Sequence, residues 1–131
     1  GTFTRWPFQL GPRVKVLGEY GGLGYAVSGH EWTPGTGAWG YGGRMHTDAQ
    51  AYQAALEGLF NRLLPLLCGG GLGAAIYTQW TDVESETNGL LTYDRLPKLP
   101  IEVLRTYSQS LLEAWRQCKQ LAAAASASAV R

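Results

Sequence analysis

Residues 72–80 read LGAAIYTQW, a continuous and largely apolar run that follows a glycine cluster. This composition is typical of a strand in a parallel sheet, because such a strand is buried on both faces and shows no alternation of polar and apolar residues. We therefore predict a strand from Leu72 to Trp80. Asp82 follows it and opens a polar loop.

An amphipathic helix is predicted before this strand. The segment Thr47-Asp48-Ala49-Gln50 matches a capping box, in which the Thr47 side chain accepts a hydrogen bond from the backbone N–H of Gln50. Apolar residues then recur at three- and four-residue intervals, and Pro65 is expected to kink or shorten the last turn. The apolar stripe consists of Tyr52, Leu56, Leu59, Phe60, Leu63 and Leu67.

A second helix is predicted after the strand. Pro100 has the preset φ that suits a first helical turn, and an apolar stripe continues from there to Cys118. Residues 121–131 are rich in Ala and Ser and contain few large side chains, so we predict a frayed helical tail there.

A shorter strand is predicted upstream, from Val14 to Leu17, and the glycines that follow it predict a special turn. Residues 25–45 are rich in Gly and aromatic side chains without a helical period, which indicates a long functional loop. The order strand, loop, helix, strand, loop, helix is typical of two parallel βα units. Two parallel strands cannot close a core, so we expect further strands to be needed.

The composition argues against several classes of protein. The chain has 131 residues and is 45% hydrophobic, which suits one packed domain. Its 11 Lys and Arg nearly balance its 10 Asp and Glu and are scattered, so nucleic-acid binding is not expected. No apolar run approaches the roughly 20 residues that cross a bilayer, so no membrane partner is expected either.

The two cysteines, Cys68 and Cys118, have no second thiol or His at metal-ligand spacing nearby. Neither a metal site nor another cofactor is therefore expected. Each cysteine lies near the predicted end of a helix, and unpaired cysteines are commonly buried. We expect two free, partly buried thiols, with a disulfide as the alternative.

Candidate functional residues stand at the predicted ends of both strands. Glu19 follows the first strand, among glycines that let a backbone approach a ligand closely, and Gln79 and Trp80 end the second. Reactive groups collect at the carboxyl ends of parallel strands, so we expect the Glu19 carboxylate beside the Trp80 indole. An indole offers a flat apolar face for a sugar ring. The pattern alone also permits an ion-paired glutamate and a packed tryptophan.

Several segments of the chain resemble glycoside hydrolase family 2, in particular members described as β-galactosidase-like. In order they are VLGEYGGLG at 16–24, GHEW at 29–32, WGY at 39–41, YTQWTDVE at 77–84 and NGLLTYDR at 88–95. The similarity runs from about Val14 to about Lys98 and continues less specifically through the last helix.

The resemblance implies an α/β fold, a partial (β/α)₈ TIM barrel of which this chain would be the last two βα units. Residues 1–120 would belong to the barrel and residues 121–131 would be a low-complexity tail. In that family a glutamate in a Glu-aromatic-Gly context ends the seventh strand and is the nucleophile, and Glu19 matches it.

The resemblance also implies a set of substrate-binding residues. The aromatic residue that ends the eighth strand lines the sugar subsite in the family, and Trp80 matches it, with Gln79 and Asp82 on either side. Asn88 matches a loop that reaches the substrate in some members, although a turn-forming Asn-Gly is an equal alternative. His30, Glu31 and Trp32 lie in the loop after the seventh strand, where we expect a structural anchor in preference to direct sugar contact.

The second working carboxylate of such an enzyme is missing. Retaining glycosidases use two carboxyl groups about 5–5.5 Å apart. In the family the acid/base is a Glu preceded by Asn, and no Asn-Glu pair occurs in this sequence. We therefore expect a carbohydrate-binding part of a hydrolase that requires the remainder of the barrel and does not hydrolyse glycosides alone. The alternatives are a noncatalytic carbohydrate-binding or interaction module and a small α/β domain unrelated to sugars.

Overall fold

A computed structural model describes residues 13–35 and 37–129 of the chain. In this part of the chain two parallel strands, β1 and β2, form a sheet, and each strand is followed by a long helix. The elements are β1 (Lys15–Gly21), a short 3-10 helix η1 (Tyr41–Gly43), α1 (Ala49–Cys68), β2 (Leu72–Thr78) and α2 (Ile101–Ala129). The predicted order of two βα units in a mixed α/β chain is confirmed.

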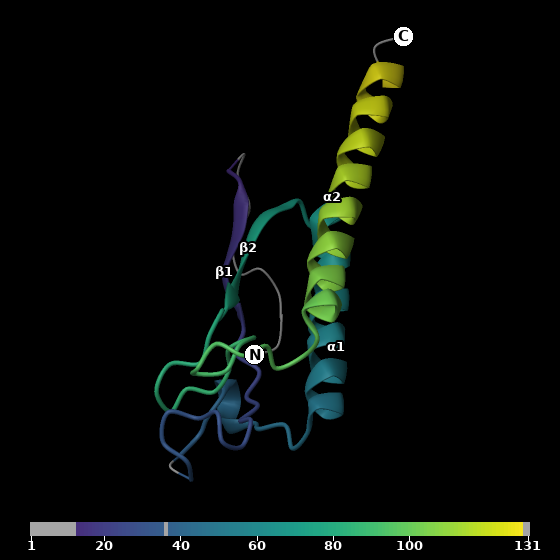
Figure 1. The fold of residues 1–131 in the computed structure, drawn as a ribbon. Coiled ribbons are helices and arrows are strands. Elements are labelled where there is room, and N and C mark those ends of the chain that lie inside the picture. The colour runs from purple at the N-terminus through teal and green to yellow at the C-terminus, as the bar shows by residue number, and fades with distance from the viewer. Residues whose placement is uncertain (1–12, 36, 130–131) are drawn as a thin grey trace.

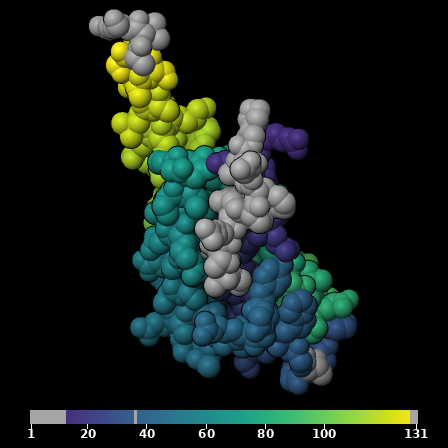
Figure 2. Space-filling model, turned by 180° about the vertical axis from the view of Figure 1, so that it is seen from behind, coloured from purple at the N-terminus to yellow at the C-terminus, as the bar shows by residue number. Residues whose placement is uncertain are grey.

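Both helices lie on the same side of the sheet (Figure 1). They run opposite to the strands, so the carboxyl ends of the strands and the starts of the helices share one end of the molecule. The connecting loops gather at that end, and the C-terminal part of α2 extends past the opposite end (Figures 1 and 2). Every candidate functional residue lies on or beside these loops.

Strand β1 is longer than predicted. It runs through Gly18 to Gly21, because its backbone continues to pair with β2 up to the partners Tyr20 with Tyr77 and Gly21 with Thr78. The register shifts between Leu17 and Tyr20. Glu19 therefore lies inside the strand near its carboxyl end, not beyond it.

The core lies between the sheet and the helices. The apolar stripe predicted for α1 supplies much of it, since Tyr52, Leu56, Leu59, Phe60 and Leu63 are all buried. Tyr20 of β1 meets the rings of Phe60 and Tyr77 edge-on, at centroid distances of 6.2 and 5.2 Å. The other buried apolar residues are Leu72, Leu91, Leu99 and Leu104.

The sheet has a second face that the helices do not cover. Val16 of β1 and Ile76 of β2 are exposed, as is Val14 just before β1, although strands of this composition are expected to be buried on both sides. The expectation that β2 is buried on both faces is therefore wrong for this chain as it stands. An uncovered row of branched side chains is a surface that favours contact with further protein.

The ends of α1 differ from the prediction in two details. Asp48, not Thr47, is the N-cap, and its side chain accepts a hydrogen bond of 2.8 Å from the backbone N–H of Ala51. Thr47 instead donates to the Asp48 carboxylate. Pro65 does not end the helix, which continues to Cys68. The Pro65 carbonyl accepts from the backbone N–H of Gly69, so the last turn stays hydrogen-bonded.

Helix α2 begins directly after Pro100, as predicted, and continues to Ala129 as one helix. The predicted helical tail is thus present through the last described residue. Its side chains from 121 to 128 are exposed, which agrees with the lack of large residues to bury. No helix in the described part of the chain is both long enough and apolar enough to span a membrane.

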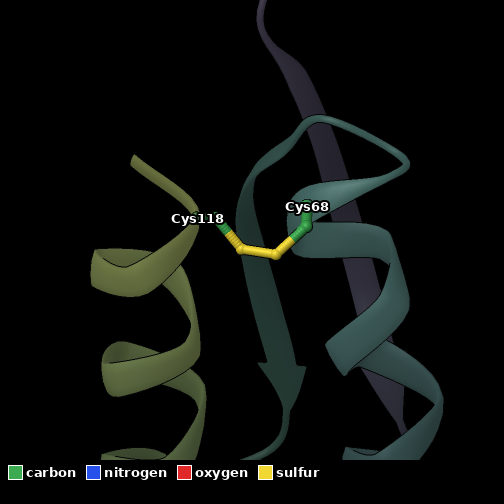
Figure 3. The surroundings of a disulfide bond; sticks show 2 residues. All are labelled: Cys68 and Cys118. Carbon is green, nitrogen blue, oxygen red and sulfur yellow. A yellow bond between two sulfur atoms is a disulfide. The ribbon is translucent and has the colours of Figure 1, made fainter. Parts of the chain in front are cut away.

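The expectation of two free thiols is wrong. Cys68 and Cys118 form a disulfide that joins the end of α1 to α2, near the start of β2 (Figure 3). Their Cα atoms are 5.4 Å apart, a usual separation for a cystine. Spacing along the sequence could not reveal this pairing, because the two cysteines approach each other only when the helices pack side by side.

Candidate functional site

Glu19 and Trp80 lie at the same end of the sheet. Glu19 is an exposed residue near the carboxyl end of β1, and Trp80 comes two residues after the end of β2. The two strands are parallel hydrogen-bonded neighbours, so both residues belong to the loop-bearing end of the molecule. The sequence prediction that these two positions come from neighbouring strands is confirmed.

Tyr41 connects the two strand ends. Its hydroxyl group is hydrogen-bonded to the side chains of Glu19 and Thr78. Partial burial, and then the hydrogen bond to the Glu19 carboxylate, raises the pKa of the Tyr41 phenol above its usual value. Because a carboxylate can only accept, the Tyr41 hydroxyl is the donor in the hydrogen bond to Glu19, and this bond orients the carboxylate.

A glycine makes room for this tyrosine. Gly22 is buried with φ of +67°, and a Cβ atom at that position would overlap the Tyr41 ring. The backbone of Gly22 also donates to Thr78 over 2.6 Å and accepts from the backbone N–H of Tyr41 over 2.7 Å. Only glycine combines this φ with such a close approach, so the turn after β1 positions Tyr41 against both strands.

A chain of amide and carboxylate groups extends the site. Gln79 Nε2 donates to Asn88 Oδ1 over 2.8 Å, and Asn88 Nδ2 donates to Glu86 Oε1 over 2.9 Å. Asn88 is fully buried, and its role is to orient its two neighbours. Glu86 is close enough to Tyr41 to contribute to the raised pKa of the phenol.

Two tryptophans expose large aromatic surfaces near this network. Trp80 has 64% of its surface exposed and Trp39 has 42%, which is unusual for such large apolar side chains. The backbone of Trp39 is fixed, since it donates to Ser85 and accepts from Thr87, both over 3.0 Å. Each indole is thus held by its backbone while its ring remains open to a ligand.

Asp82 is placed differently from the other predicted residues. Its side chain is 2% exposed and pairs with Lys98, which is completely buried, at 2.7 Å. Burial raises the pKa of Asp82 and lowers that of Lys98, and the attraction between the two groups opposes both shifts. Lys98 also donates to the backbone carbonyls of Tyr25 and Thr87. The pair therefore fastens the two loops together beneath the exposed residues.

The loop after β1 is also anchored at its far side. Glu31 accepts hydrogen bonds from the backbone N–H groups of Gly29 and His30, and His30 Nδ1 lies 2.8 Å from Asp94 Oδ2. These contacts match the expected structural role of His30 and Glu31. Trp32 is about half exposed and lies beside Tyr93, with ring centroids 6.5 Å apart.

The chemistry available here is that of a carboxylate, a phenol and amides around aromatic rings. Within residues 13–35 and 37–129, no group of three or more His, Cys, Asp or Glu side chains could hold a metal ion. Glu19 can act as a nucleophile or an acceptor, Tyr41 can hold it in position, and the amide chain can bind hydroxyl groups.

Sequence reasoning did not assign Tyr41, Glu86 or Lys98 to the site. A lysine inside the apolar run Leu96-Pro97-Lys98-Leu99-Pro100 was a signal of a buried cation, because an exposed lysine rarely has only Leu and Pro around it. For Tyr41 the signal was indirect, in the glycines that follow β1. Nothing local to Glu86 indicated its hydrogen bond to Asn88.

Comparison with models of protein families and with curated proteins found no match to this chain.

Proposed function

We propose that this chain is part of a retaining glycoside hydrolase, the last two βα units of a (β/α)₈ barrel, in which Glu19 is the nucleophile. The substrate would be a carbohydrate with an O-glycosidic bond, of the kind that β-galactosidase-like enzymes cleave. One observation carries the proposal, namely that Glu19 and Trp80 lie at the carboxyl ends of neighbouring parallel strands. A carboxylate and an exposed indole there form a minimal arrangement for stacking a sugar and attacking its anomeric carbon.

The open face of the sheet supports a requirement for the remainder of a barrel. Val14, Val16 and Ile76 are exposed, and both helices lie on one side of the sheet (Figure 1). In a closed barrel such branched side chains lie in the packed interior layers. Leu112 and Trp115 of α2 are exposed as well, as expected of a helix that packs on a neighbouring βα unit.

Sugar binding and the first chemical step need fewer groups than full turnover does. Glu19, held by Tyr41, would supply the attack that forms a glycosyl-enzyme intermediate. Protonation of the leaving oxygen and activation of water need a second carboxyl group, and the sequence lacks the Asn-Glu pair that provides it in the family. The chain alone would therefore bind a sugar without cleaving an ordinary glycoside.

Covalent trapping tests this function without the second carboxyl group. In a 2-deoxy-2-fluoro-β-galactosyl fluoride, fluoride leaves without acid assistance while a bond forms between a Glu19 oxygen and the anomeric carbon. Incubation followed by intact-mass and peptide analysis is expected to give one adduct, on Glu19. Glu19→Gln should give none, whereas Glu113→Gln, a change on the exposed surface of α2, should label like the unaltered chain.

A noncatalytic carbohydrate-binding module is the second candidate, because the exposed Trp80 indole could hold a sugar without any chemistry at Glu19. Sugar binding that Trp80→Ala abolishes, without any adduct, would support this alternative. Absence of both binding and labelling for galacto-, gluco- and manno-configured reagents would rule out both candidates.

A further inference from the structure

Trp39 lies two residues before Tyr41, the residue that reaches Glu19. Gly40 has an extended backbone, with φ of −134° and ψ of 178°. Side chains alternate along extended backbone, so those of Trp39 and Tyr41 lie on the same side of the chain. Tyr41 contacts Glu19, and Trp39 therefore belongs to the same side of the loop as the proposed nucleophile.

A carboxylate accompanies this indole. Trp39 and Glu86 are bridge partners, because their segments are joined by backbone hydrogen bonds on both sides of the pair. Asn88 holds the Glu86 carboxylate from one side, and that carboxylate keeps further lone pairs for other donors. An aromatic face next to an oriented carboxylate can stack a sugar ring and accept hydrogen bonds from its hydroxyl groups.

The two aromatic–carboxylate pairs are connected. Trp80 adjoins Gln79, whose amide reaches Glu86 through Asn88, and Glu86 adjoins Trp39. A tryptophan and a glutamate thus occur twice at this end of the molecule, as Trp80 with Glu19 at the strand ends and as the bridge partners Trp39 and Glu86. Neither tryptophan is needed for the core, since both rings are exposed.

We infer that Trp39 and Glu86 form a second sugar subsite beside the Glu19–Trp80 site, and that the ligand is a β-linked glycan with at least two rings. This inference rests on the proposed function and specifies the substrate class. The ring bound at Trp39 adds its own stacking contact, so a disaccharide binds more tightly than a single sugar.

Calorimetric titration of the unaltered chain with methyl β-galactoside and with lactose tests the inference, with the corresponding glucose and mannose pairs in parallel. The disaccharide is expected to bind about tenfold more tightly, the effect of covering part of one aromatic side chain. Trp39→Ala should remove this advantage and leave the affinity for the methyl glycoside within about twofold. Trp39→Tyr should retain most of the advantage, and Trp80→Ala should weaken both sugars.

Trp32→Ala is the matched control, because it removes another exposed indole from the same loop. Far-UV circular dichroism and a thermal melt of each variant establish that it is folded. Equal affinities for the two sugars, or an equal loss of both with Trp39→Ala, would overturn the second subsite and leave the proposed function standing. If no methyl glycoside and no disaccharide binds the unaltered chain, the proposed function fails together with the inference.

Discussion

Lys98 Nζ lies 2.7 Å from Asp82 Oδ1, and both side chains are almost completely removed from solvent. The lysine reaches this position from the segment just before α2, while the aspartate follows β2. With its two backbone acceptors, Lys98 leaves no N–H group of the ammonium without a partner. The ion pair thus closes the loop region beneath the candidate site.

Removal of the lysine is expected to be costly. Lys98→Met leaves the Asp82 carboxylate buried without its cation, and loss of one partner of a buried pair costs about 3–5 kcal/mol. Urea unfolding followed by circular dichroism measures the change. Lys119→Met provides the control, because Lys119 lies on the exposed surface of α2 over the Trp115 ring and should change stability by about 1 kcal/mol at most. Equal losses in the two variants would contradict the role assigned to the pair.

The disulfide is expected to contribute strongly to stability. It closes a loop between residues separated by 50 positions, and the chain-entropy estimate for a loop of that length is about 4 kcal/mol. The urea concentration at the midpoint of unfolding should therefore fall when a reductant is added. The double variant Cys68→Ser/Cys118→Ser should match the reduced chain and show no response to reductant. A response in the double variant would show that reductant acts elsewhere.

Gly22→Ala is expected to disrupt the site. The substitution places a side chain at positive φ and drives Cβ into the Tyr41 ring, which together cost about 2–5 kcal/mol. Gly29→Ala is the matched control, because Gly29 has φ of +83° but open space around its Cβ position. It should cost about 1–2 kcal/mol from backbone strain alone. Near-UV circular dichroism should report displaced aromatic rings in Gly22→Ala only.

Acid is expected to weaken the start of α1. The hydrogen bond from Ala51, followed by that from Thr47, lowers the pKa of Asp48 below its usual value. The folded state therefore favours the charged carboxylate, and this stabilisation is present above the unfolded pKa near 4 and is lost as the pH falls through the lower folded value. Asp48→Asn keeps a capping oxygen but cannot titrate.

Thermal melts between pH 7 and pH 2 measure this effect. The melting temperature of the unaltered chain should fall more steeply with acid than that of Asp48→Asn. Asp94→Asn, which removes another carboxylate with a lowered pKa, should reduce the slope separately, because the two groups lie in different loops. Identical slopes for all three proteins would contradict the assignment.

Local patterns in the sequence were enough to predict both helices and the pairing of parallel strands. The stripe from Tyr52 to Leu63 predicts the buried face of α1, because helical periodicity places these residues on one side. The capping residue was missed by one position, since Thr47 and Asp48 are both good N-caps and it is the Asp48 side chain that accepts from the backbone N–H of Ala51.

The residues that complete the candidate site could not be predicted in the same way. Strand ends are local features, so the positions of Glu19 and Trp80 suggested both residues, and the family resemblance supported that prediction. Lys98 bonds to Tyr25 across 73 residues, and Tyr41 meets Glu19 only through the turn at Gly22. Such contacts depend on how the loops cross, and no periodic pattern encodes that crossing.

The two ends of this molecule are secured by separate means. A covalent bond joins the end of α1 to α2 (Figure 3), whereas the Lys98–Asp82 pair joins the segment after β2 to the segment before α2. The two links also differ in chemistry, because a reducing agent cleaves a disulfide and leaves an ion pair intact. Reduction would consequently release one end of the molecule while the other end keeps its connection.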